Sequence, residues 1–447
     1  MDGNICNQKR AELIGELHFP GGLELLRAWQ SGDVLAGDRL KAILDKTIAG
    51  HYDELFSLPA PADQVHACGP VDLLTLTVMF RLYGTTTEIF YKQDAERFIR
   101  SSLMMQRLMG MQKHYISWPV YGFTAEALGQ EMIYSDQYSP GTDPDNSLFN
   151  RDNWQEIETP DLDSGIPQLL DQYLECFHRL TGQQPVLHLT APYSLAADTF
   201  GQEAIIGALT HEPDFANQFL DLLADRVLQP WMERFFQRYP QGWVELSDAS
   251  GSPFFIGPNN CRDMAIRSIN RLKKANPWGD RVYDANYRGD YVTCAERPVK
   301  SRSRRSGKRT DTSPGMSLQT LFEAKDSVCP DYVIRLAEDR IPVDFYETQA
   351  INTRKPLFIG IGATQIDRNS IADLTLHKSE TGILTREYVE SIKRVAIEIA
   401  QKGYESRLPP WPGTIYFEDI SAESSFELIQ IIVATVLNHG GFTLRHE

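Results

Sequence analysis

Two short apolar runs, each followed by polar residues and a helical pattern, constrain the fold of this chain more than any other feature. Residues 185–189 run into Thr190, and residues 243–246 run into Ser247 and Asp248. Apolar residues recur at helical spacing between the two runs. Consecutive parallel strands need such a crossover, so the segment predicts two parallel strands with polar loops at one edge. An α/β barrel carries its chemistry at this edge.

Short apolar runs of this kind recur along the chain. Eight are separated mostly by helical patterns, at residues 65–69, 114–119, 186–189, 243–246, 281–287, 343–348, 356–361 and 414–418. Alternating strands and helices in this number predict an α/β fold, a (β/α)8 barrel of the TIM type over residues 61–447. Residues 1–60 have amphipathic helical patterning, as at Leu23, Leu26 and Trp29, and predict a helical N-terminal cap.

Composition excludes several classes of function. The net charge of −16 disfavours a nucleic-acid-binding protein, because a phosphate backbone would be repelled. No apolar stretch approaches the ~20 residues that a membrane span needs. The first residues lack the apolar core of a signal peptide, and the six cysteines include no CxxC pair. We therefore expect a cytoplasmic protein with reduced thiols. The sequence leaves open whether the chain is a monomer or a homodimer.

Several motifs resemble the uroporphyrinogen decarboxylase superfamily, which includes that decarboxylase and the corrinoid-linked methyltransferases. The matching segments are TAPYSLA at 190–196, HEPD at 211–214 and SDASGS at 247–252. EALG at 126–129 and the region 346–360 resemble the methyltransferase branch. The resemblance implies an enzyme that acts on a small molecule in the barrel mouth, with methyl transfer as the leading reaction and a corrinoid on a partner protein.

Departures from the family's motifs keep alternatives open. The methyltransferases hold zinc with a His-x-Cys pair after the fifth strand, and residues 284–289 contain neither residue type. Zinc is therefore not expected in the family's usual site. The decarboxylase's arginine-bearing motif is also missing from residues 67–72. A decarboxylase for uroporphyrinogen or another carboxylated substrate is one alternative, and a non-catalytic barrel used as a binding or assembly subunit is another.

Polar residues at predicted strand ends are the candidate catalytic groups. Asp248, Asp284 and Glu347 each follow an apolar run, so a barrel would bring their carboxylates to one face. Two carboxylates in one cavity can shift each other's pKa and divide the roles of acid and base. His66 and Cys68 point the same way on a strand and are a candidate metal-binding pair.

Further residues are candidates for contacting a substrate. Asn286 and Arg288 follow the fifth run, and the other candidates are Tyr193, His188, His439 and Trp118. A basic insertion at 299–315 carries six Lys and Arg residues between 300 and 309. This insertion is interpreted either as a solvated loop or as a clamp for an anionic substrate or an acidic partner.

Overall fold

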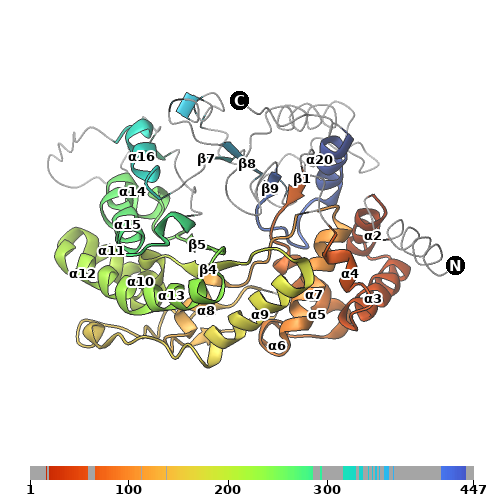
Figure 1. Ribbon diagram of the computed structural model, residues 1–447, viewed down its shortest axis with the longest axis horizontal. Coiled ribbons are helices and arrows are strands. Elements are labelled where there is room, and N and C mark those ends of the chain that lie inside the picture. Colours follow the sequence, from red (N-terminus) through yellow and green to blue (C-terminus); the bar gives the residue numbers. More distant parts are fainter. Residues whose placement is uncertain are drawn as a thin grey trace, which may run out of the picture.

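The computed structural model shows a mixed α/β protein with parallel strands at its centre and helices on both flanks (Figure 1). The structure describes residues 17, 20–58, 66–111, 113–136, 138–284, 292–293, 316–328, 332–335, 341, 345, 348–349, 352, 357–361, 366 and 414–438.

The described helices precede, connect and follow the strands. They are α2 Gly21–Gln30, α3 Val34–Ile48, α4 Asp53–Phe56, α5 Asp72–Tyr83, α6 Thr87–Lys92, α7 Ala95–Leu108, α8 Val120–Glu126, η1 Trp154–Glu156, α9 Gly165–Thr181, α10 Pro192–Phe200, α11 Gln202–His211, α12 Pro213–Leu223, η2 Ala224–Leu228, α13 Gln229–Arg238, α14 Pro253–Asn260, η3 Cys261–Ile266, α15 Arg267–Ala275, η4 Gly279–Arg281, α16 Leu318–Lys325 and α20 Phe426–Asn438.

The strands form two parallel sheets and one small hairpin. They are β1 His66–Cys68, β2 Met132–Ile133, β3 Gly141–Thr142, β4 Val186–Thr190, β5 Trp243–Ser247, β6 Val282–Asp284, β7 Tyr332–Arg335, β8 Leu357–Ile361 and β9 Thr414–Phe417. One parallel sheet has the order β4-β5-β6 and the other β1-β9-β8-β7, whereas β2 and β3 pair antiparallel. Closure of the two parallel sheets into one barrel remains a prediction.

Alternation along the strands explains why β4 and β5 are buried on both faces. Leu187, Leu189, Val244 and Leu246 are at most 1% exposed and point to one side of the sheet. On the other side, His188 of β4 pairs with Glu245 of β5, which pairs with Tyr283 of β6. The apolar side packs in the core under the helices, and the other side carries a buried polar row.

Six of the eight predicted strands are confirmed as β1, β4, β5, β6, β8 and β9. The strand predicted at 114–119 is wrong, because the N–H and C=O of Tyr115 bond with the Gln106 side chain instead of a strand. The strand predicted at 343–348 is also wrong: the described positions Phe345 and Thr348 are helical. The positions 345, 348 and 349 follow helical spacing, and the Phe345 ring packs against Phe322 of α16. β8 pairs with β9 on one side and with β7 on the other, and the sequence analysis missed β7.

The N-terminal helices share the core of the rest of the chain. Helix α2 contacts α7 and α20, α3 contacts α7, and α4 contacts α9. The expected amphipathic pattern is confirmed, since Leu23, Leu26 and Trp29 are at most 6% exposed. Residue 60 as a boundary between a cap and a barrel stays a prediction.

The structure also bears on the expectations about a membrane span, the cysteines and the basic insertion. No helix among the described residues is long and apolar enough to cross a membrane. Cys68, Cys176 and Cys261 are buried, reduced thiols. The basic insertion at 299–315 lies outside the described residues.

Candidate active site

A cavity of about 320 Å³ lies at the carboxyl ends of the parallel strands, and we call it the carboxyl-end cavity. Ser247 ends β5 and Asp248 follows it into this cavity, and Glu418 and Asp419 follow β9. Asp72 enters from the start of α5. The lining includes five carboxylates and no lysine or arginine among the residues that the structure describes, and its aromatic members are Tyr115, Trp118, Tyr121 and Tyr416.

Asp248 is held at the cavity by hydrogen bonds from two elements. Its Oδ1 accepts from the backbone N–H and the hydroxyl of Ser194 at 3.1 and 2.7 Å. The carboxylate is 2% exposed, and Gly251 lies so close that a Cβ there would be 2.2 Å from Oδ2. Burial raises the pKa of Asp248 to about 6, although the bonds from Ser194 and Gly251 and the charge of Lys325 act to lower it. Asp248 is therefore mostly ionised at neutral pH.

Asp198 is a second buried carboxyl group, and it interacts electrostatically with Asp248. Asp198 lies one turn after Ser194 on α10, and its buried Oδ2 has no hydrogen-bond partner. Burial and, secondarily, the charge of Asp248 raise the pKa of Asp198 to about 8, so this group is mostly protonated at neutral pH. Tyr193 is also buried here without a partner for its hydroxyl. Asp198 therefore keeps its proton to higher pH than Asp248 does.

Asp72 forms a third buried acidic position. It is 8% exposed, and the Tyr91 hydroxyl donates to its Oδ2 at 3.0 Å. Burial and the charge of Asp419 raise the pKa of Asp72 to about 6, against the lowering effect of the Tyr91 bond. Asp419 adopts the left-handed conformation with φ 39°, which is costly for a residue with a Cβ. Strain of this kind gathers at functional sites.

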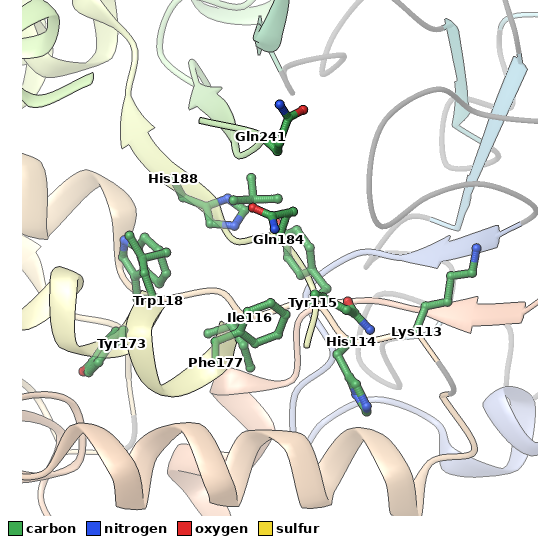
Figure 2. A pocket seen from close by; sticks show the side chains of 13 residues that line it. Lys113, His114, Tyr115, Ile116, Trp118, Tyr173, Phe177, Gln184, His188 and Gln241 are labelled. Carbon is green, nitrogen blue, oxygen red and sulfur yellow. The ribbon is translucent and has the colours of Figure 1, made fainter. Parts of the chain in front are cut away.

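A second cavity of about 560 Å³ opens at the amino ends of β4 and β5 (Figure 2). Gln184 and Gln241, which precede these strands, lie at its edge, and Tyr173 and Phe177 of α9 add aromatic walls. This amino-end cavity shares Tyr115, Trp118 and His188 with the carboxyl-end cavity. We place the candidate active site at the carboxyl ends, because that cavity gathers the carboxylates and follows the rule for parallel α/β folds.

The structure brings together only some of the predicted site residues. Asp248, His188 and Trp118 line the carboxyl-end cavity. Asp284 ends β6 at the same edge and is 3% exposed, but it lines neither cavity. Tyr193 of α10 is fully buried and also lines neither cavity. The remaining candidates Glu347, Asn286, Arg288 and His439 lie outside the described residues.

The predicted metal pair gains no further ligands in the described part of the chain. Cys68 is fully buried, and burial raises the pKa of its thiol far above the ordinary value despite the nearby Lys113 charge. The His66 backbone lies in β1, and its side chain is outside the description. No group of three or more His, Cys, Asp or Glu suited to a metal occurs among the described residues.

Several residues of the site were missed by sequence reasoning. Glu245 lies in the middle of β5, where a single acidic residue in an apolar run was a usable signal. Tyr115, Asp72 and Asp419 face the cavity from segments far apart in the sequence, and nothing local marked them. Asp198 is placed by the helical spacing from Ser194.

Comparison with known proteins supports the fold and little beyond it. No protein-family model matches the chain, and no curated protein matches it. A solved structure described as a methyltransferase from Methanosarcina mazei matches with a TM-score of 0.56 at 14% identity. The match covers 89% of this chain and 98% of that one. At this identity the likeness shows a shared fold.

Proposed function

We propose that the chain is a methyltransferase-like enzyme that acts on a small molecule bound in the carboxyl-end cavity. The observation that carries the proposal is the buried carboxylate of Asp248, fixed at a strand end and facing a cavity of about 320 Å³. The fold shared with an archaeal methyltransferase supports the reaction class. Buried ionisable groups with displaced pKa values are typical of active sites.

Asp248 and Asp198 have different roles in this proposal. The ionised Asp248 orients the substrate by accepting a hydrogen bond or attracting positive charge in a site of low dielectric constant. The protonated Asp198 keeps a second negative charge away from Asp248. Protonation of Asp198 lets Asp248 stay ionised while it is 2% exposed.

The methyl source proposed is a methylated corrinoid presented by a partner protein. Among the described residues, no group of three or more His, Cys, Asp or Glu surrounds Cys68 that could hold the zinc of the methyltransferases that the sequence resembles. We assign activation of the methyl acceptor to side chains of the described cavity.

Decarboxylation of a polycarboxylate has less support from the cavity. A substrate with several carboxylates is held best by arginine, and the described lining offers five acidic residues instead. Like charges would repel such a substrate. Methyl transfer to a neutral or cationic acceptor fits this lining better.

The test is methyl transfer from methylcobalamin to a panel of small thiols, alcohols and amines. Asp248→Asn should lower kcat/KM by about 10²–10⁴-fold while circular dichroism shows an unchanged fold. Asp263→Asn is the control, because Asp263 is exposed and pairs only locally with Arg262. Absence of transfer to every acceptor would refute the proposal, and binding of a panel member without turnover would favour a non-catalytic barrel.

A further inference from the structure

A buried row of polar side chains crosses β4, β5 and β6 beneath the carboxyl-end cavity. Glu245 is 6% exposed, accepts hydrogen bonds from two tyrosines and lies beside His188. Tyr115 donates to Oε1 at 2.9 Å, Tyr283 donates to Oε2 at 2.6 Å, and Nδ1 of His188 lies 3.2 Å from Oε1. Burying polar and charged side chains costs free energy of folding, and apolar side chains in this row would stabilise the protein more. The arrangement therefore points to a role beyond stability.

The hydrogen bonds determine which nitrogen of His188 carries a proton. The Tyr115 hydroxyl has one proton, which it donates to Glu245. Burial acts to raise the pKa of Glu245, but His188 and the bonds from His188, Tyr283 and Tyr115 hold it below 4.5. Nδ1 of His188 lies 3.3 Å from the Tyr115 oxygen and 3.2 Å from Oε1 of Glu245. Because the Tyr115 proton goes to Glu245 and an ionised Glu245 only accepts, Nδ1 carries the proton. The lone pair of neutral His188 is then on Nε2.

His188 is placed where a ligand can reach it. The side chain is 1% exposed and yet lines both cavities. Figure 2 shows it projecting from β4 toward Tyr115, and its ring meets that of Trp118 edge to face at 5.0 Å. Glu245, Tyr115 and Tyr283 are the titratable groups on this row, with Tyr416 of β9 5.8 Å beyond Tyr115. A carboxylate behind an imidazole that faces a cavity is the arrangement of a general base.

We propose that His188, positioned by Glu245, is the general base that deprotonates a thiol or hydroxyl methyl acceptor in the carboxyl-end cavity. This inference rests on the proposed function and names the acceptor class. The S–H or O–H bond breaks, its electrons stay on sulfur or oxygen, and the proton joins Nε2. The imidazolium is then stabilised by Glu245. The nucleophile forms a bond to the methyl carbon, and the electrons of the broken bond leave with the donor.

The experiment measures kcat/KM against pH with methylcobalamin and 2-mercaptoethanol or a reactive alcohol from the panel. His188→Gln should lower kcat/KM by about 10²–10⁴-fold and abolish the rise of the rate with pH. Glu245→Gln should lower the plateau and move the rise to lower pH, because the imidazolium loses its counter-charge. Tyr283→Phe should instead move the rise to higher pH, because Glu245 loses a competing donor and its charge stabilises the imidazolium more strongly; this variant serves if Glu245→Gln does not fold.

His178→Gln is the matched control, since His178 binds the Gln183 carbonyl and lines neither cavity. Nitrogen NMR of labelled histidine should show the Nδ1–H form of His188 in the native protein. Full activity and an unchanged pH profile in His188→Gln would overturn the inference, and loss of activity in Asp248→Asn would then leave the proposed function standing. Native protein that methylates only amines would overturn the acceptor class, and no transfer at all would overturn both proposals.

Discussion

Ser194 binds one oxygen of Asp248 twice, through its backbone N–H at 3.1 Å and its hydroxyl at 2.7 Å. The same hydroxyl accepts from the N–H of Ser250, so it ties the loop after β5 to helix α10. One serine therefore supplies two of the hydrogen bonds that fix the position and charge of this carboxylate.

Replacing Ser194 by alanine should raise the pKa of Asp248 above its value of about 6. The carboxylate loses a donor that favours its ionised form and keeps the backbone N–H. The measurement is a carbon NMR titration of the Asp248 carboxyl group. Ser101→Ala is the control, since Ser101 is fully buried and its hydroxyl has no partner. A lower or unchanged pKa in Ser194→Ala would contradict the assigned role of the hydroxyl.

Asp198→Asn should stabilise the protein more at high pH than at low pH. The folded pKa of Asp198 is about 8, above its ordinary 3.8, so the native protein loses stability as pH rises from about 4 to 8. Asparagine has no charge to bury beside Asp248. We expect a gain of roughly 1–4 kcal/mol at pH 9 and a much smaller one at pH 5, measured by urea unfolding. The same gain at both pH values would show that burial of the charge is not the cause.

Gly251→Ala should displace the Asp248 carboxylate. The new Cβ would lie 2.2 Å from Oδ2, so the loop must shift, at a cost of roughly 1–3 kcal/mol. Gly207→Ala is the comparison: nothing lies within 4 Å of a Cβ there, and α11 should gain about 0.5–1 kcal/mol. Thermal unfolding of both variants measures these two changes in stability. Equal effects in the two variants would mean that the contact with Asp248 is relaxed at little cost.

Leu26→Ala tests whether the N-terminal helices are part of the common core. Leu26 is fully buried in α2, which packs on α7 and α20, so the loss should be about 2–5 kcal/mol. Leu35→Ala should be nearly neutral, because Leu35 is 78% exposed. Chemical denaturation of both variants measures the difference. A separate early transition in Leu26→Ala would indicate that residues 20–58 unfold on their own.

The sequence predicted β4 and β5 correctly, because the pattern that marks each strand is local. β4 and β5 are runs of apolar residues broken by turn residues, and Asp248 follows β5 directly. β7 was missed although its apolar residues Tyr332–Ile334 directly follow the turn residues Pro330 and Asp331. The mistaken strand at 343–348 contains apolar residues that fit either period.

By itself, the sequence predicted six of the strands and identified Asp248, His188 and Trp118 as candidates for the site. Only the tertiary structure decided that His188 binds Glu245 and that Asp72 and Asp419 face the cavity with Asp248. Local periodicity fixes the side of a strand on which a residue lies. The register between β4 and β5, and the approach of β9 to β1, depend on how the whole core packs, and no single segment encodes them.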